Sequence, residues 1–338
     1  MNGLLALIIA LLPVLGLLLG LILLDSYKLV PLRSAMAMIV AGAIVALLCY
    51  LILRAWLEAG SLTAIELSRY VAPWIEEIAK GVLVVWLIRT ARIGFLVDAT
   101  IYGFAIGAGF AVVENLSYFL LLETTEVGFW IVRGFGTAVL HGGTVALVAV
   151  TARFLADRTS SALRWRIYVP GLLLAVFIHS LYNQFLVSPR ISTVIVLLAL
   201  PALVFVVFRI SEAATRDWLG IGFDTDCELL ELINEGRITG SHVGGYLETL
   251  RDRFPGTAIA DMICLIRLHL ELSIQAKGLL IARQSGFEVE PSADFGAQLD
   301  ELRFLERSIG RTGMLALRPI FNVDSRELWQ VQLLLNRP

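Results

Sequence analysis

The chain has 338 residues, of which 58% are hydrophobic and 17% charged, and its mean hydropathy is +0.80. This composition excludes an ordinary soluble protein, because the sequence contains several apolar runs of the roughly 20 residues that a membrane-spanning helix needs. Its three cysteines have neither the number nor the spacing of a disulfide framework or a zinc cluster. We therefore expect an all-α, polytopic transmembrane helix bundle.

Apolar runs predict about seven spanning helices, and the loops between them predict an orientation. The first run is too long for a signal peptide and lacks a basic start and a cleavage site, so we expect it to be retained. Lys and Arg gather in the first, third and fifth loops, which places these loops in the cytoplasm. The sequence thus predicts a multi-pass protein of the plasma (inner) membrane with its N-terminus outside and its C-terminal region in the cytoplasm. The predicted spans are residues 3–24, 31–53, 72–88, 95–122, 130–152, 167–188 and 191–209.

The charge balance changes sign near residue 210. Residues 1–210 contain 14 Lys and Arg against 10 Asp and Glu, whereas residues 211–338 contain 13 against 19. This change predicts a transmembrane domain at 1–210 and a soluble, acidic domain at 211–338, for which nucleic acid is an unsuitable partner. The sequence identifies no other partner for this second domain.

Stretches with helical periodicity, separated by Gly and Pro residues, predict that the second domain is a small bundle of helices. Ser241 and Ser292 are the expected N-caps of its second and fourth helices. His242 and His269 are expected to be surface or helix-face residues, because neither has a ligand-type neighbour three or four residues away. The predicted helices are 226–235, 241–253, 257–284, 292–309 and 324–335.

Polar residues inside the apolar segments are few and fall at similar depths. An ionisable group in hydrocarbon costs roughly 2.5–3.5 kcal/mol, so each one suggests a task or a compensating partner. With 1.5 Å of rise per residue, the predicted topology places the ionisable members about 6–16 Å below the outer end of their helices. Four consecutive segments therefore bring carboxylates and imidazoles to one level in the outer half of the membrane, which predicts a hydrolytic site. Its members are Glu76, Glu77, Lys80, Glu114, Asn115, His141, His179 and Asn183.

Two hydrolytic routes use these residue types, and the sequence leaves both open. In the first, His141, His179 and either Glu114 or Glu76 bind Zn²⁺, and Glu77 is the general base. In the second, no metal is bound: a buried Glu activates water, and the histidines and the amide of Asn183 stabilise the developing oxyanion. Asn183 also lies one turn after His179 and could orient its ring.

The spacing within residues 76–80 predicts a division of labour between the two adjacent carboxylates. Glu76 and Lys80 lie four residues apart and share a helix face, so we expect Lys80 to hold Glu76. Glu77 is rotated by about 100° and would then be free for water, which makes it the first choice for general base, with Glu76 interchangeable.

Two other classes of function would also place carboxylates in a membrane. A transporter or channel relays protons or ions through such groups, but it needs a polar path that the inner halves of these helices do not offer. A membrane sensor or scaffold would act through the second domain and would not need the polar cluster. Glycines near the cluster, among them Gly107 and Gly109, are expected either to border a wet cavity or to let helices approach closely.

At these residues the chain resembles the PrsW family of intramembrane proteases. The resemblance rests on EEIAKG at 76–81, GFAVVENLSY at 109–118, His141 in HGGTVAL and HSLYNQF at 179–185. The chain is similar, more distantly, to the CAAX prenyl protease and bacteriocin-processing superfamily. It departs from that superfamily at Glu114, where a His would be expected, and at Lys80, where an Arg would be expected.

The resemblance implies a membrane-embedded protease, in a family usually classed as metalloproteases, whose substrate is a membrane-anchored protein. The namesake of the family cleaves a membrane-anchored anti-sigma factor at its extracytoplasmic side. By the resemblance, Glu76, Glu77 and His179 are catalytic residues, and Glu114 and His141 are further members of the site. It covers residues 70–190 and says nothing of the chain from residue 211.

Overall fold

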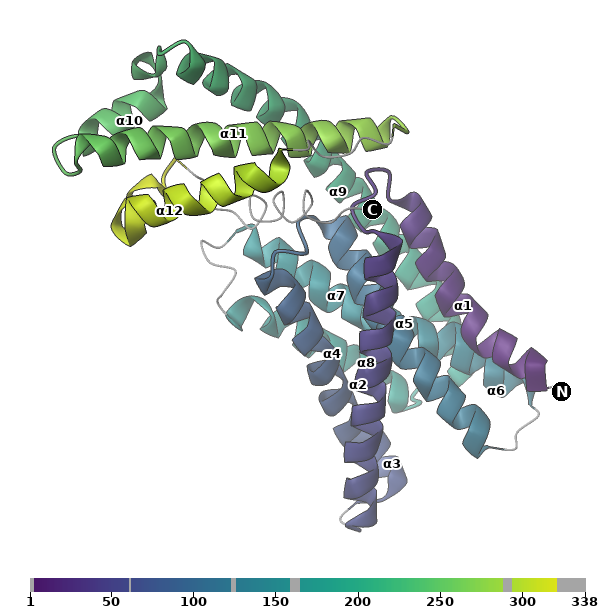
Figure 1. Ribbon diagram of the computed structural model, residues 1–338. Coiled ribbons are helices and arrows are strands. Elements are labelled where there is room, and N and C mark those ends of the chain that lie inside the picture. The colour runs from purple at the N-terminus through teal and green to yellow at the C-terminus, as the bar shows by residue number, and fades with distance from the viewer. Residues whose placement is uncertain (1–2, 61, 123–125, 159–164, 288–293, 321–338) are drawn as a thin grey trace. The chain divides into compact units, whose positions relative to one another are not determined.

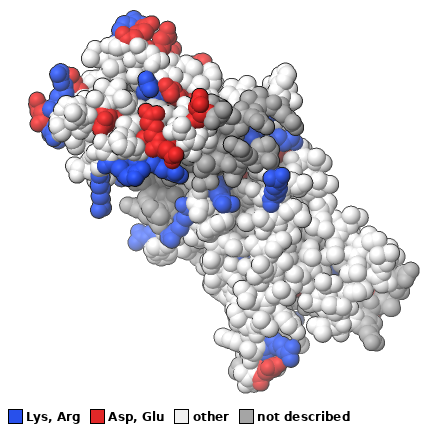
Figure 2. Space-filling view, viewed as in Figure 1, with Lys and Arg blue, Asp and Glu red and all other residues white. Residues whose placement is uncertain are grey.

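The computed structural model describes residues 3–60, 62–122, 126–158, 165–287 and 294–320, and only the backbone of Pro201 (Figure 1). Every regular element in these ranges is a helix. The chain separates into two compact units, residues 1–212 and 213–338. In Figure 2 the visible surface of the first unit is mostly uncharged, as expected of a membrane domain.

The first unit is a bundle of helices that confirms the predicted fold class. Six helices of the described residues are long and apolar enough to cross a membrane. The third predicted span, residues 72–88, corresponds to the 18-residue helix α4, which is not among these six because it carries Glu76, Glu77, Lys80 and Arg89. The elements are α1 (Gly3–Leu24), α2 (Leu32–Glu58), α3 (Ala64–Glu66), η1 (Leu67–Val71), α4 (Ala72–Arg89), α5 (Leu96–Leu121), α6 (Val127–Ile131), η2 (Val132–Ala138), α7 (Val139–Ala156), η3 (Trp165–Ile167), α8 (Val169–Asn183) and the first part of α9 (Pro189–Asn234).

Helix α5 is the centre of the bundle, because α2 and α7 pack along it and α1 and α4 also contact it. Every residue from Val97 to Ala111 is buried, which explains why this stretch carries no charged side chain apart from Asp98. Two glycines make the packing possible. A Cβ atom at Gly107 would lie 2.1 Å from the carbonyl oxygen of His141 on α7, and one at Gly109 would lie 1.9 Å from that of Ile39 on α2. These glycines therefore serve close helix approach, and the expectation that they border a cavity is wrong.

Gly107→Ala is expected to destabilise the first unit by about 1–3 kcal/mol, the usual cost of overpacking. The added methyl group would have to push the α7 backbone away at His141. Thermal unfolding in detergent measures the effect. Gly16→Ala in α1 is the matched control, since nothing lies within 4 Å of the added carbon there. Equal melting temperatures for the two variants would contradict this packing.

Helix α9 corrects one prediction. The sequence predicts a spanning helix that ends at residue 209 and a separate helix at 226–235, whereas α9 is continuous over 46 residues. Between these two segments, Gly220 and Gly222 are the strongest breakers. A helical glycine costs only about 1 kcal/mol relative to Ala, which weakens a helix without ending it.

The second unit contains the end of α9, η4 (Ile238–Gly240), α10 (His242–Leu250), α11 (Gly256–Gln284) and α12 (Phe295–Leu317). Ser241 is the N-cap of α10 as predicted, because its Oγ accepts a hydrogen bond of 3.0 Å from the N–H of Gly244. Ser292 and the predicted helix at 324–335 lie outside the described residues. Helix α12 extends past the predicted end at residue 309, with a kink at Gly310, where φ is 70°.

The two histidines of this unit differ in exposure. His242 is exposed, whereas His269 is half-buried on α11. Burial lowers the pKa of His269 to about 4, so that its ring is neutral at pH 7.

Candidate active site

Glu77 and Lys80 form a buried ion pair on α4. Both side chains are fully buried, and the Lys80 Nζ donates to Glu77 Oε1 over 2.6 Å. The same carboxylate oxygen accepts from Thr144 Oγ1 at 3.3 Å and from His179 Nδ1 at 2.8 Å. Because an ionised carboxylate only accepts hydrogen bonds, His179 carries a proton on Nδ1, and in the neutral ring Nε2 then has a lone pair.

This ion pair corrects the predicted division of labour between the carboxylates. Lys80 was expected to hold Glu76, four residues away, but it holds Glu77, three residues away. Both spacings bring side chains together on a helix, so the surroundings decide between them. The Lys80 Nζ also lies 3.0 Å from His141 Nδ1 on α7 and 4.5 Å from the centre of the Phe110 ring on α5. These contacts direct the ammonium to the side of the helix that carries Glu77.

Glu76 is left without a cation. Its side chain is buried but lines a cavity, and its Oε2 has no hydrogen-bond partner among the described residues. The imidazole nearest to this oxygen is that of His179, whose Nε2 lies 4.0 Å from Glu76 Oε2. The carboxylate of Glu76 and the imidazole of His179 therefore face each other without a direct hydrogen bond.

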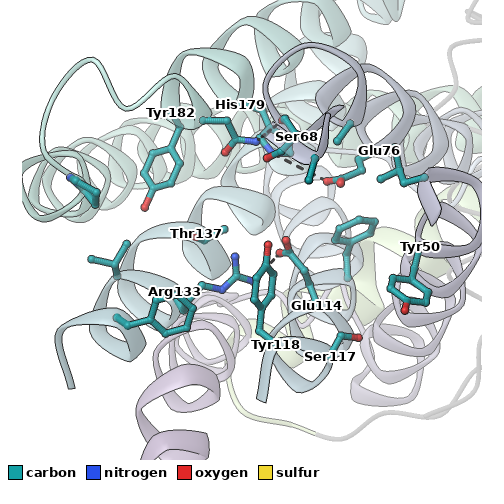
Figure 3. Close-up of a pocket in the computed structure, with 18 of the residues that line it drawn as sticks. Tyr50, Ser68, Glu76, Glu114, Ser117, Tyr118, Arg133, Thr137, His179 and Tyr182 are labelled. Atoms are coloured by element: carbon teal, nitrogen blue, oxygen red, sulfur yellow. Dashed lines mark hydrogen bonds and ion pairs between the residues drawn. The ribbon is translucent and has the colours of Figure 1, made fainter. Parts of the chain in front are cut away.

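A second ion pair lies across the cavity, on α5 and η2. Glu114 Oε2 lies 2.9 Å from Arg133 Nη2 and 2.9 Å from His141 Nε2. Arg133 is buried, and its guanidinium lies 4.1 Å from the centre of the Tyr118 ring. Figure 3 shows Arg133 and Tyr118 beside Glu114, with Glu76 and His179 at the other wall of the cavity.

The sequence analysis missed Arg133 and Thr144. Arg133 carried a usable signal, since it is an arginine inside a predicted spanning segment, where a charge demands a partner. Thr144 carried none, because a hydroxyl in a membrane helix usually bonds to its own backbone.

Asn183 lies in the wall of the cavity, where its amide nitrogen donates to the carbonyl oxygen of Ser68 over 3.1 Å. The predicted alternative, that it orients the His179 ring, is wrong, because Glu77 holds that ring instead. An amide nitrogen has two hydrogens, so one donor of Asn183 remains for another acceptor.

The cavity has a volume of about 910 Å³ and lies at one end of the first unit. The C-terminal parts of α2, α5 and α8 surround it together with the segments at the beginning of α4 and α7. Its α2 wall is apolar, and its polar side chains come mainly from the other helices. Residues of the wall include Ala46, Cys49, Leu53, Ser68, Glu76, Phe110, Glu114, Tyr118, Arg133, His179, Tyr182 and Asn183.

Two π-helical segments lead into the helices that carry the site. η1 passes directly into α4 with its Glu76–Glu77 pair, and η2 passes into α7 with His141. A wider turn changes the direction of the side chains that follow it, and π-helical turns occur often at functional sites.

Comparison with protein families gave one match. The model of the PrsW family intramembrane metalloprotease matches residues 30–210, which is more than half of the chain. The chain belongs to the PrsW family. No curated protein and no solved structure matches it.

Membership of the PrsW family identifies the chain as an intramembrane protease and favours the protease prediction over a transporter or a scaffold. The match includes Glu76, Glu77, Glu114, His141 and His179. Helix α1 and the whole second unit lie outside it.

The residues of this PrsW family member could hold a metal ion. Glu76, His141 and His179 each offer one ligand atom, and the three atoms lie within 4.8 Å of one another. The charges also suit a cation. Among the described residues, the three carboxylates of Glu76, Glu77 and Glu114 form ion pairs with two basic side chains, Lys80 and Arg133, and Oε2 of both Glu76 and Glu77 lacks a hydrogen-bond partner. Two imidazoles and one carboxylate are a common donor set for Zn²⁺.

The geometry favours Glu76 over Glu114 in this donor set, because Glu114 is paired with Arg133 and is not part of the group. His141 would have to release one contact to bind a metal. Its Nε2 faces Glu114, and its Nδ1 faces the ammonium of Lys80.

Proposed function

We propose that the chain is an intramembrane endopeptidase that hydrolyses a peptide bond of a membrane-anchored protein with water activated by Glu76. One observation carries the proposal. In a cluster of three carboxylates, Glu77 and Glu114 are each paired with a cation, whereas Glu76 is paired with neither Lys80 nor Arg133 and borders the cavity. One oxygen of Glu76 and one of Glu77 lack a hydrogen-bond partner, but Glu77 is fully buried. A general base needs such a carboxylate, with an oxygen that is not already taken by a cation.

In the proposed reaction, Glu76 takes a proton from a water molecule in the cavity as the water oxygen attacks the peptide carbonyl carbon. The free donor of Asn183 then stabilises the oxyanion. When the C–N bond breaks, Glu76 delivers the proton to the leaving amine nitrogen. A bound Zn²⁺ would polarise the carbonyl and acidify the water. His179, His141 and one oxygen of Glu76 would hold it, and the other oxygen of Glu76 would take the proton.

Glu77 has a supporting role in this proposal rather than the role of base. Its Oε1 already accepts three hydrogen bonds, from Lys80, Thr144 and His179. The third of these bonds fixes the ring of His179 and turns Nε2 toward Glu76. A carboxylate that orients a histidine through its other nitrogen is a recurrent feature of metal sites.

The position of the cavity supports cleavage near the extracytoplasmic face. The cavity lies at the bundle end that carries the second, fourth and sixth loops, which the distribution of Lys and Arg predicts to be outside. Its apolar α2 wall suits an apolar segment at the end of a substrate's membrane anchor. An anti-sigma factor is one candidate substrate, and the second unit is proposed to be cytoplasmic, with a partner that is not identified.

Comparing membrane proteins from cells with the wild-type chain and cells with Glu76→Gln tests the proposal. We expect at least one membrane-anchored protein to be shortened only in wild-type cells, with a new terminus near the outer membrane boundary. Identical membrane proteomes, under conditions where both chains are made and inserted, would contradict a protease with this base.

Removal of metal is expected to abolish cleavage. We expect the purified protein to contain about one Zn²⁺ per chain, since two imidazoles and a carboxylate form one site. Elemental analysis measures this content, which should fall in the variants Glu76→Gln and His179→Ala but stay in Glu58→Gln, at the exposed end of α2. A protein that is active without metal would support the metal-free route instead.

A further inference from the structure

Tyr182 contributes an unpaired hydroxyl to the wall of the cavity. Its side chain belongs to the lining, and only 9% of the residue is exposed. The Oη atom is buried and has no hydrogen-bond partner among the described residues. A buried tyrosine hydroxyl normally finds such a partner, and an unpaired one lowers the stability of the fold. The hydroxyl of Tyr182 therefore points to a ligand of the cavity.

The segment η2 leaves room for this hydroxyl. A Cβ atom at Gly136 would lie 2.3 Å from Tyr182 Oη and 2.5 Å from Thr193 Oγ1, so a larger residue would fill the space of the phenol. The neighbouring hydroxyl of Thr193 already donates to the carbonyl oxygen of Pro189 over 2.8 Å. In Figure 3 the Tyr182 ring projects into the cavity from α8, with its oxygen directed toward the wall that carries Thr137.

Tyr182 lies one helical turn after His179, which faces the proposed base Glu76. Residues three positions apart share a helix face and are separated by about 4.5 Å along the axis. An extended peptide advances about 3.3 Å per residue. A chain that presents its scissile carbonyl to Glu76 would thus bring a carbonyl one or two residues away to Tyr182. Because α8 is predicted to run outward, that carbonyl lies on the extracytoplasmic side of the cleaved bond.

We propose that Tyr182 binds the substrate backbone: its hydroxyl donates a hydrogen bond to a peptide carbonyl on the extracytoplasmic side of the cleaved bond. This inference rests on the proposed function, since it takes a peptide as the ligand of the cavity. In a helix each carbonyl oxygen already accepts from the N–H four residues later, whereas an extended segment leaves its carbonyls available. The substrate class is therefore a membrane-anchored protein whose chain is extended at the outer end of its anchor.

Peptide binding tests the hydroxyl independently of cleavage. The probe is an acetylated octapeptide amide of alternating Leu and Gly, which is too short and too rich in Gly to stay helical. Every chain in this assay carries Glu76→Gln, so that the probe is not hydrolysed. We expect Tyr182→Phe to weaken binding about 2–10-fold, the contribution of one neutral hydrogen bond. Tyr50→Phe on the α2 wall is the matched control and should have no effect, because Arg54 already hydrogen-bonds with that hydroxyl.

Ester analogues of the probe identify the carbonyl that Tyr182 binds. Replacing one amide of the probe by an ester makes the carbonyl at that position a weaker acceptor. With Tyr182 present, one ester position should weaken binding more than the others do. In Tyr182→Phe this extra loss should disappear, because the two changes remove the same hydrogen bond.

Two further variants separate the hydroxyl from the packing around it. Gly136→Ala keeps the hydroxyl but occupies its space, so it should also weaken binding of the probe. Gly128→Ala is its control, since the added carbon would lie 3.7 Å from Arg190 Nη2, an ordinary contact. Without the probe, Tyr182→Phe should melt at or above the temperature of its parent, because no described residue bonds to the hydroxyl.

Kinetics extend the test to cleavage. For a cleaved membrane-anchored substrate, Tyr182→Phe should raise KM about 2–10-fold and leave kcat nearly unchanged, since the bond is made equally in the ground and transition states. A fall in kcat without a change in KM would overturn this role and place the hydroxyl at the reacting carbonyl instead.

Unchanged probe binding in Tyr182→Phe, equal ester losses in both chains, or a lower melting temperature without the probe would also overturn the proposal. A chain that binds the probe in the expected pattern, but whose wild type cleaves nothing, would contradict the proposed function and leave the binding role of Tyr182 supported.

Discussion

Glu76→Gln is expected to reduce kcat by about 10²–10⁴-fold, the contribution of a general base, while the protein inserts and unfolds as the wild type does. The reason is the way in which the charged side chains of the site are paired. Glu76 accepts no hydrogen bond from Lys80 or Arg133, so its replacement leaves each of these cations with its own carboxylate partner. The amide has nearly the same shape, so the variant removes the proton acceptor, together with one ligand of a bound Zn²⁺, without changing the packing.

Glu77→Gln is the informative comparison, because it changes the adjacent residue in the same way. It would leave the buried ammonium of Lys80 without an anion, so we expect the melting temperature to fall along with activity. Activity in detergent and thermal unfolding separate the two variants. A variant Glu77→Gln that is inactive but as stable as the wild type, beside an active Glu76→Gln, would make Glu77 the base, as the sequence analysis preferred.

The sequence predicted how deep each polar residue lies in the membrane, but not the direction in which its side chain points around the helix. Depth along a helix depends on a rise of 1.5 Å per residue, and errors of two or three residues in a boundary shift it by only a few ångströms. The structure accordingly lines one cavity with Glu76, Glu114 and His179, and it places a ligand atom of His141 within 4.8 Å of those of Glu76 and His179. These residues are separated by up to 103 positions in the chain, and only the alternation of spans placed them together.

The sequence could not predict which neighbour each polar side chain contacts around its helix. Lys80 reaches a residue three or four positions earlier with equal ease, and the choice of Glu77 was made by His141 and Phe110 on other helices. The π-helical segments η1 and η2 add to this uncertainty, since each shifts the phase of the helix that follows it. No periodicity in the sequence marks such segments.

Lys80→Met is expected to lower the free energy of unfolding by about 3–5 kcal/mol, the cost of leaving one member of a buried ion pair alone. Glu77 would keep its charge with only Thr144 and His179 as donors, in a place from which water is excluded. Met has a similar length and packs beside Phe110, so the loss reports on charge rather than on volume. Denaturant unfolding in detergent measures it.

The double variant Lys80→Met with Glu77→Gln should recover most of that stability, because no unpaired charge then remains in the pair. It should stay inactive, since a neutral amide would hold His179 less firmly than the carboxylate does and His141 would face no ammonium. Recovery of stability without recovery of cleavage would show that the pair both neutralises a buried charge and orients the two imidazoles. If Lys80→Met were as stable as the wild type, the ammonium would not be the partner of Glu77, and the assignment of Glu76 as the free carboxylate would lose its basis.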